Sequence, residues 1–311
     1  MSDVREVVMI GAGPSALSAA IYTTREDIDT ILYEKGVIGG LAAITDKVDN
    51  YPGFPDGIEG MTLAEQLQKQ AERFGANIEL GDVSALRRDG DEIVVTVDGN
   101  EVRTKTVLIA TGSDYSKLGI PGEAEYYGRG VHYCATCDGA FYRDKRLVVV
   151  GGGNSGVQET IFLTRFASHI DLLVRSTIKA SQVLQDDLQQ YIDSGKVTVH
   201  LSTTPDEIVT QDGKVTAVRV TKDGAQSDIE TDGVFVFIGL KPNTQFLAGS
   251  DVELDELGLV KTNEKLETNV PGVYASGDVR SGATMQVASA VGEGATAALE
   301  IREYLDALKR K

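Results

Sequence analysis

Two glycine-rich turns, one near the start of the chain and one near its middle, constrain the fold more than any other feature. The first turn, GAGPSA at residues 11–16, follows the apolar run at residues 7–10. The second turn, GGGNSG at residues 151–156, follows the apolar run at residues 147–150. A buried strand that passes through a tight glycine turn into a helix is the opening of a βαβ unit. The sequence therefore predicts an α/β fold in which this motif starts twice.

The residues after each turn also follow a common plan. A hairpin is predicted at an Asp-Gly turn in each half, at residues 98–99 and 223–224, and an apolar strand follows each hairpin. A last strand at residues 273–276 leads into a helical tail, in which no further βαβ unit starts. We therefore predict two Rossmann-like dinucleotide-binding domains, of which the first is discontinuous. The predicted boundaries are 1–114 and 246–311 for the first domain and 117–243 for the second.

A helix is predicted at residues 62–74. Thr62 and Glu65 have the spacing of a capping box, apolar residues recur on one helical face, and Gly75 follows as a stop signal. The sequence thus places the start of this helix at Thr62.

The charge balance of the chain excludes two classes of partner. Its 311 residues include 47 acidic and 30 basic side chains, for a formal net charge of -17. A surface of this sign repels phosphate backbones and anionic lipids, so neither nucleic acid nor a membrane is expected as a partner. No apolar run approaches the ~20 residues that span a bilayer, and the charged N-terminal segment is not a signal peptide. We expect a cytoplasmic protein.

The first glycine turn has the features of a dinucleotide site. Glycine permits the tight turn and lets backbone N–H groups at the helix N-terminus approach a pyrophosphate. Glu34 ends the next strand, predicted at residues 30–33, where a carboxylate binds ribose hydroxyls. Alanine takes the third glycine position, which is an allowed variant. The candidate residues are Gly11, Gly13, Pro14, Ser15, Ala16 and Glu34.

The second turn carries all three glycines, but a basic residue replaces the acid at the end of the next strand. Arg175 follows the strand predicted at residues 170–174, and Lys179 lies nearby. Arginine accommodates the 2′-phosphate of NADP, which a carboxylate would repel, so NADPH is favoured over NADH. The alternative is that both residues are ordinary surface charges. The other candidate residues are Gly151, Gly153, Asn154, Ser155 and Gly156.

The chain contains two cysteines, Cys134 and Cys137, in a C-x-x-C motif. With no other cysteine and no cluster of histidines, a zinc site cannot be assembled, so no metal is expected. The spacing suits a reversible disulfide at the start of a helix, whose dipole favours a thiolate. Asp138 follows directly, either to move a proton for a leaving thiolate or to cap the helical turn. His132 either tunes Cys134 or is a packed or solvated histidine, and the sequence favours the second.

Taken together, these residues resemble the low-molecular-weight thioredoxin reductases over nearly the whole chain. The resemblance also extends to GGLA at 39–42, NYPG at 50–53, ATG at 110–112, GD at 277–278 and QVA at 286–288. It implies FAD in the first domain, NADPH in the second, and a homodimer. The positions that it implies around the flavin are Glu34, Asn50, Asp278, Gln286 and Val287. The further cofactor positions are Gly40, Leu41, Thr111, Gly112, Gly277 and Ala288.

The resemblance also implies a chemistry. Hydride would pass from NADPH to FAD, and two electrons would then reduce the disulfide. Cys137 would face the flavin, Cys134 would attack the disulfide of thioredoxin, and Asp138 would act as acid and base. One departure concerns the nucleotide site. The family has a His-Arg-Arg cluster where this chain has Val174-Arg175-Ser176, in which only the first arginine matches.

Three alternatives remain open. The chain could act as a dithiol oxidase that uses oxygen, or as a thioredoxin reductase fed by ferredoxin. Either activity would account for the incomplete arginine cluster. The third alternative is a non-enzymatic redox sensor, in which the C-x-x-C motif reports to a partner without turnover.

Overall fold

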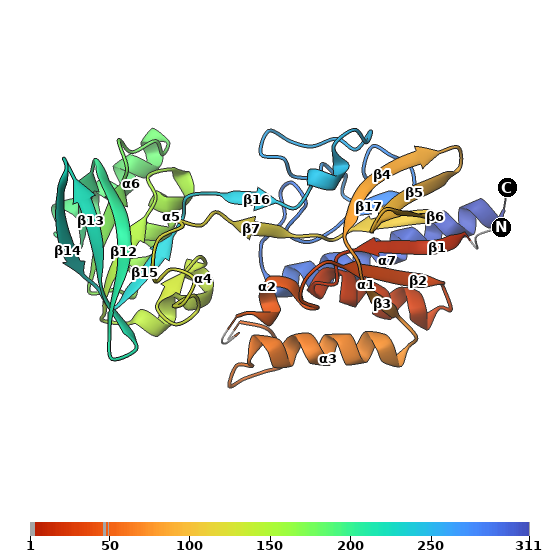
Figure 1. Ribbon diagram of the computed structural model, residues 1–311, viewed down its shortest axis with the longest axis horizontal. Helices are drawn as coiled ribbons and strands as arrows, with labels where there is room; N and C mark the ends of the chain where they lie inside the picture. Colours follow the sequence, from red (N-terminus) through yellow and green to blue (C-terminus); the bar gives the residue numbers. More distant parts are fainter. Residues whose placement is uncertain (1–3, 46–47, 49, 311) are drawn as a thin grey trace. The chain divides into compact units, whose positions relative to one another are not determined.

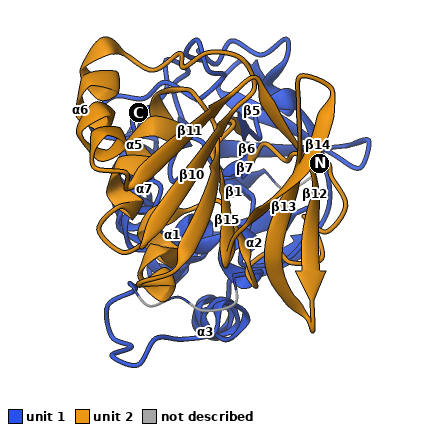
Figure 2. Cartoon of the chain, turned by 90° about the vertical axis from the view of Figure 1, so that its left-hand side faces the viewer, with its two compact units in different colours: residues 1–114, 241–311 blue, residues 115–240 orange. Residues whose placement is uncertain are grey.

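The computed structural model describes residues 4–45, 48 and 50–310. The chain divides into two compact units, coloured separately in Figure 2. The first unit combines Met1–Asp114 with Lys241–Lys311, and the second is Tyr115–Leu240. The second unit is therefore one continuous stretch inserted between two parts of the first. The prediction of an α/β fold with two Rossmann-like sheets is confirmed.

The first unit is built on a seven-stranded, largely parallel sheet. Its strands are β1 (Arg5–Ile10), β2 (Thr30–Glu34), β3 (Asn77–Leu80), β4 (Val83–Asp89), β5 (Glu92–Val97), β6 (Asn100–Ile109) and β17 (Val273–Ala275). The spatial order is β3-β2-β1-β6-β5-β4, and β17 also pairs with β6. β6 is shared, because residues 100–104 pair with β5 whereas residues 107–109 pair with β17. The last strand of the chain thus completes the sheet that the first strand begins.

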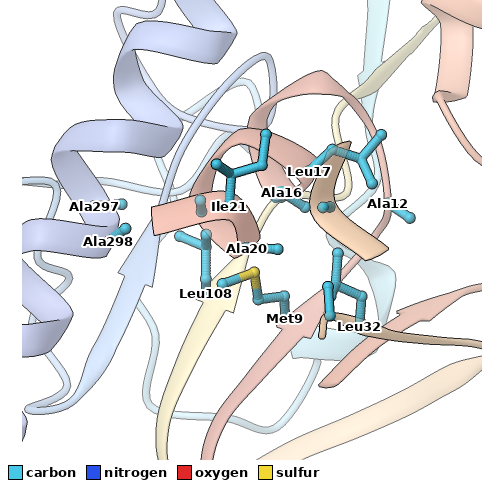
Figure 3. Packing of buried hydrophobic residues seen from close by; sticks show 14 of the residues in the cluster. Met9, Ala12, Ala16, Leu17, Ala20, Ile21, Leu32, Leu108, Ala297 and Ala298 are labelled. Carbon is cyan, nitrogen blue, oxygen red and sulfur yellow. The ribbon is translucent and has the colours of Figure 1, made fainter. Parts of the chain in front are cut away.

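Helices cover this sheet, and the C-terminal helix packs against the N-terminal one (Figure 1). The helices are α1 (Pro14–Arg25), α2 (Gly40–Ala43), α3 (Gly60–Arg73) and α7 (Val287–Lys309), with a 3-10 turn η2 (Gln245–Leu247). A Cβ on Gly294 of α7 would lie 2.1 Å from the backbone O of Ser15 in α1, so only glycine allows this approach. Figure 3 shows the core beside this contact, which includes Met9, Leu17, Leu32, Leu108 and Ala298.

The helix with the predicted start at Thr62 is α3, but it begins at Gly60 and its N-cap residue is Glu59. Thr62 is already inside the helix, where its Oγ1 donates to Oε2 of Glu59 at 3.0 Å. The predicted capping box of Thr62 and Glu65 is wrong. The earlier start depends on a glycine, since a Cβ on Gly60 would lie 2.0 Å from the backbone O of Ala42.

The second unit contains a five-stranded parallel sheet and a three-stranded antiparallel sheet. In spatial order, the parallel sheet has β11 (Val197–Leu201), β10 (His169–Val174), β9 (Arg146–Val150), β15 (Gly233–Val236) and β8 (Val131–His132). The antiparallel sheet has β12 (Thr203–Gln211), β13 (Lys214–Lys222) and β14 (Ala225–Glu230). The helical elements are α4 (Ala135–Asp138), η1 (Gly139–Tyr142), α5 (Asn154–Leu163) and α6 (Gln182–Asp193). Within the described part of the chain, every helix is too short or too polar for a membrane span.

Two short strands connect the units. β7 (Ser113–Tyr115) leads into the second unit, β16 (Leu240–Pro242) leads out of it, and the two strands pair with each other. Next to them, the N–H of Ser116 donates to the O of Gly239 at 2.9 Å. The two ends of the second unit therefore leave it side by side.

Candidate functional site

The first glycine turn lies between β1 and α1 and leaves the N-terminus of the helix open. Gly11 has a φ of +98°, and a Cβ there would lie 2.5 Å from the O of Ala110, so the turn requires glycine. Gly13 is the N-cap residue of α1, and nothing lies within 4 Å of where its Cβ would be. Pro14 occupies the first turn, while Ala16, at the third glycine position, is fully buried. The free N–H groups at this end suit the phosphate oxygens of a dinucleotide.

Glu34 lies at the end of β2, next to this turn. Its Oε2 accepts from the N–H of Ala12 and its Oε1 from the N–H of Gly36, each at 2.8 Å. The two bonds hold the carboxylate in one orientation, and each oxygen keeps a lone pair for a further donor. The carboxylate is therefore an acceptor suited to ribose hydroxyls.

A cavity of about 310 Å³ opens beside Glu34 within the first unit. Its lining includes Thr111, and also Asn243 and Phe246, which carry no sequence motif. The Nδ2 of Asn243 donates to the O of Thr111 at 3.0 Å, and the N–H of Asn243 donates to the O of Gly112 at 3.0 Å. No local pattern marks Asn243, because it joins the cavity only when the two parts of the first unit pack together.

The Gly277-Asp278 segment follows β17 and lies beside the N-terminus of α1. The Oγ atoms of Ser276 and Ser15 are 2.6 Å apart, and a Cβ on Gly277 would lie 3.2 Å from the Cβ of Ser15. Burial raises the pKa of the Asp278 carboxyl to about 6, and the negative charge of Glu293 contributes to the rise. The structure therefore brings Ser15 and Gly277, which are distant in sequence, to the same end of α1.

The segment that opens α2 packs on the first turn. Gly40 and Leu41 are the first residues of α2, and the N–H of Gly39 before them donates to the O of Ala12 at 2.8 Å. A Cβ on Gly40 would lie 3.8 Å from the Cα of Gly13. These two candidates are thus close to the glycine turn.

The start of α7 brings together the remaining candidates of the first unit. Gln286 is the N-cap residue of α7, and Val287 and Ala288 form its first turn. The Nδ2 of Asn50 donates to the Oε1 of Gln286 at 2.9 Å. Asn50 and Gln286 belong to the two separate segments of the unit, so folding joins them.

The second glycine turn, between β9 and α5, repeats the geometry of the first. Gly151 has a φ of +145°, and a Cβ there would lie 2.2 Å from the O of Phe237. A Cβ on Gly156 would lie 2.2 Å from the O of Gly151, so glycine is required at both positions. Gly153 is the N-cap residue of α5 and has open space where its Cβ would be. This helix N-terminus can also receive a phosphate.

Arg175 and Lys179 lie in the segment that follows β10. Both side chains are exposed, and neither forms a hydrogen bond or ion pair with any described residue. The Oδ1 of Asn154 accepts from the N–H of Ser181 at 2.8 Å, which ties this segment to the start of α5, where Ser155 is also exposed. Two cations therefore lie on the segment attached to the open helix N-terminus.

Cys134 and Cys137 form a disulfide with an S–S distance of 2.09 Å and Cα atoms 5.3 Å apart. Cys134 is the N-cap residue of α4, and its Sγ accepts from the N–H of Cys137 at 3.1 Å. Both cysteines are half-buried, and Thr136 between them is exposed. The pair therefore follows the edge strand β8, with Thr136 open to solvent between the two cysteines.

Asp138 is the last residue of α4 and the N-cap residue of η1. Its side chain forms no capping hydrogen bond with η1, and the side-chain cap of α4 is Cys134. Its Oδ2 lies 3.1 Å from the Nδ1 of His132, which is within ion-pair distance. The Nε2 of His132 lies 2.7 Å from the Oη of Tyr142, and the His132 ring stacks on Phe235 with the centroids 5.1 Å apart. His132 is packed, as the sequence favours, but both its nitrogens face polar groups.

Comparison with known proteins places this geometry in a family. The chain matches the pyridine nucleotide-disulphide oxidoreductase family over residues 5–294. Thioredoxin reductase of Listeria innocua is 41% identical over 98% of this chain and 95% of that protein. Thioredoxin reductase of Bacillus subtilis is 39% identical over 98% of this chain and 96% of that protein.

A solved structure gives the same result. The structure of thioredoxin reductase from Streptococcus pyogenes has a TM-score of 0.93 and 36% identity, covering 99% of this chain and 100% of that chain. The paired glycine turns and the C-x-x-C disulfide agree with this likeness. The chain therefore belongs to the pyridine nucleotide-disulphide oxidoreductase family and, within it, groups with the thioredoxin reductases.

Proposed function

We propose that the chain is a thioredoxin reductase that takes two electrons from NADPH and delivers them, with FAD, through the Cys134–Cys137 disulfide to thioredoxin. The observation that carries the proposal is the disulfide. Its cysteines follow the edge strand β8 in the second unit, which also holds the second glycine turn. The relatives named thioredoxin reductase support the choice of partner.

FAD would bind the first unit. When bound, it accepts a hydride from a nicotinamide and returns two electrons to a disulfide. The residues of this unit fit FAD. The turn at Gly11 and Gly13 leaves room for the pyrophosphate, and Glu34 offers a hydrogen-bond acceptor beside a cavity of about 310 Å³. The Gly277-Asp278 segment adds a polar group at the same end of α1.

NADPH would bind the second unit at the N-terminus of α5. Gly153 leaves this helix end open for the pyrophosphate. Arg175 and Lys179, exposed and unpaired within the described residues, supply positive charge for the 2′-phosphate. Ser176 stands where the family has a second arginine, so we expect a lower affinity for NADPH than a complete cluster gives.

The chain's own residues account for the disulfide exchange. Asp138 takes the thiol proton of Cys134, and the resulting thiolate attacks one sulfur of the thioredoxin disulfide. A bond forms between Cys134 and that sulfur, the thioredoxin disulfide breaks, and the leaving thiolate receives the proton from Asp138. Cys137 then attacks the Sγ of Cys134, which restores the Cys134–Cys137 disulfide and releases the second thioredoxin thiolate, while the Cys137 proton reaches that thiolate through solvent. Two electrons pass from the dithiol to thioredoxin.

One observation favours a second candidate. The basic cluster is incomplete, because Ser176 follows Arg175. A thioredoxin reductase fed by ferredoxin, or a dithiol oxidase, would need no such cluster. The homodimer and the cytoplasmic location remain predictions.

Anaerobic titration of the FAD-loaded protein with NADPH and with NADH, followed by flavin absorbance, tests the proposal. We expect NADPH to bleach the flavin and to support turnover of thioredoxin. Bleaching by neither nucleotide would move the assignment to the ferredoxin-fed reductase or the oxidase, and peroxide release during turnover of a small dithiol would identify the oxidase. Absence of turnover with every donor would leave the redox sensor.

A substitution of Arg175 tests the nucleotide site in the same assay. Arg175→Ala should raise the KM for NADPH about tenfold or more, because a charge-assisted contact of roughly 1.5–3 kcal/mol is lost. The KM for NADH should not change, since its ribose lacks the phosphate. Arg302→Ala, which removes an arginine paired with Glu26 on the first unit, is the matched control. Equal losses with both nucleotides would show that Arg175 is structural.

A further inference from the structure

His132 is buried next to the redox pair. It ends the edge strand β8, which pairs in parallel with β15 so that His132 lies opposite Phe235. The imidazole stacks on the Phe235 ring and meets the Tyr142 ring edge-on, with centroids 5.1 and 5.2 Å away. Only 4% of the residue is exposed. This packing holds the imidazole in one plane, and the polar contacts on its two edges set which way each nitrogen points.

Both nitrogens face polar groups of the segment that follows the cysteines. Nε2 lies 2.7 Å from the Oη of Tyr142, and Nδ1 lies 3.1 Å from the Oδ2 of Asp138. The contact with Asp138 has the distance of an ion pair, but Nδ1 has no aligned hydrogen-bond partner among the described residues. Catalytic contacts are often misaligned in this way before substrate binds and tighten in the complex. A small rotation of the carboxyl group would align this one.

Tyr142 is itself held in place and, together with Asp138, sets the imidazole tautomer. A Cβ on Gly233 would lie 2.3 Å from the Cε1 of Tyr142, so glycine makes room for the ring. Burial raises the pKa of Tyr142, and the negative charges of Asp138 and Asp232 raise it further. A carboxylate can only accept, so Asp138 beside Nδ1 favours the tautomer with the imidazole proton on Nδ1, and Nε2 then accepts from the protonated Oη of Tyr142.

We infer that His132 is a positioning residue that holds the carboxyl group of Asp138 in place for disulfide exchange. The inference rests on the proposed function, in which Asp138 moves a proton between Cys134 and the leaving thiolate. Among the described residues, the Asp138 carboxyl group has no hydrogen-bond or ion-pair partner other than His132. Without His132 the carboxyl group is free to swing toward solvent, and proton transfer slows although the disulfide can still form.

Two substitutions of similar size separate the two contacts of His132. In His132→Asn the side-chain amide takes the place of Nδ1 and keeps a donor near Asp138. In His132→Gln the amide reaches the position of Nε2 and keeps only the contact with Tyr142. We expect kcat for thioredoxin reduction to stay within about threefold of wild type in His132→Asn and to fall about tenfold or more in His132→Gln, with KM for thioredoxin unchanged. Equal losses in both variants, a loss expressed in KM, or full activity of His132→Gln would overturn the inference.

A double-mutant cycle of His132→Gln and Asp138→Asn tests whether His132 acts through Asp138. We expect His132→Gln to cost no further activity once Asp138→Asn is present, because the carboxyl group that it positions is gone. Losses that multiply would show that His132 acts elsewhere.

Tyr142→Phe tests the hydrogen bond to Nε2 of His132 without disturbing the packing, since it removes only Oη. We expect this variant to lose kcat at an unchanged KM, and full kcat would contradict the tautomer assignment.

Single-turnover oxidation separates this inference from the proposed function. Enzyme reduced with dithionite and mixed with oxidised thioredoxin reports the exchange step alone, whichever donor feeds the flavin. We expect a slow exchange in His132→Gln only, together with unchanged flavin reduction by dithionite and midpoints of thermal unfolding that match each other in the two variants, since both lose the same ring packing. Wild-type enzyme that reduces no thioredoxin would refute the proposed function, whereas His132→Gln that exchanges at the wild-type rate would refute the inference alone.

Discussion

Asp278 is a carboxyl group in surroundings that disfavour its charge. Burial raises its pKa from 3.8 to about 6, and the charge of Glu293 contributes. Because this pKa lies above that of the unfolded chain, the folded state binds the proton more tightly, and the free energy of unfolding falls as pH rises from about 4 to about 6. We expect Asp278→Asn to stabilise the FAD-free chain by roughly 2–3 kcal/mol at pH 7.5 and by less at pH 5. Urea unfolding at the two pH values measures the difference.

Asp255 provides a control of opposite sign. Burial alone raises the pKa of its carboxyl, but hydrogen bonds from Ser281 and from the backbone N–H groups of Leu259 and Leu257 lower it overall. The stabilisation from Asp255 is therefore present above its ordinary pKa and is lost as pH falls. Asp255→Asn should destabilise the chain at pH 7.5. A gain from Asp278→Asn that is the same at both pH values would contradict the account of Asp278.

The site residues that can be predicted from the sequence are those whose role depends only on their neighbours along the chain. Gly11 and Gly151 belong to turns that a side chain would block, and Cys134 and Cys137 are the two cysteines of the chain, at the spacing of a redox pair. The contacts of His132 with Asp138 and Tyr142 are not readable in this way. The three residues lie within ten positions of one another, but their contacts depend on how residues 133–142 turn back toward β8 and on the stacking of His132 on Phe235, and no spacing rule contains that arrangement.

At the scale of elements, apolar periodicity predicts that a helix exists better than where it begins. The periodic residues of α3 place its body correctly, and Thr62 and Glu65 have the right spacing for a cap. The helix nevertheless begins at Gly60, with its backbone close to the O of Ala42 in α2. This tertiary contact outweighs the local capping preference, which contributes only about 1 kcal/mol.

Two glycines in α7 test the contact between the first and last helices. Gly294 faces α1, where its Cβ would lie 2.1 Å from the O of Ser15, whereas nothing lies within 4 Å of a Cβ on Gly292. Gly292→Ala should stabilise the chain by up to about 1 kcal/mol, because alanine favours the helix. Gly294→Ala should destabilise it by roughly 1–3 kcal/mol, because α7 must move away from α1. Urea unfolding compares them, and a stabilising Gly294→Ala would refute this packing.

At the scale of the whole molecule, the chain is one unit inserted into another. The first unit is closed by its C-terminal part, because β17 pairs with β6 and α7 packs on α1. Each unit has its own buried cores, formed by strands and helices of that unit alone. The proposed function divides accordingly, with FAD on the first unit and both the nucleotide and the disulfide on the second.

This organisation predicts that the insertion can be removed. The ends of the second unit leave it side by side, since β7 pairs with β16 and the N–H of Ser116 donates to the O of Gly239 at 2.9 Å. A short Gly-Ser linker in place of residues 116–239 therefore spans the gap without straining the first unit. We expect this variant to unfold cooperatively and to bind FAD, seen as a yellow protein that dithionite bleaches and NADPH does not. Residues 115–240 alone should form the disulfide and remain colourless. A linker variant that does not fold would contradict the independence of the first unit, and one that NADPH still bleaches would show that the two sites are not divided between the units in this way.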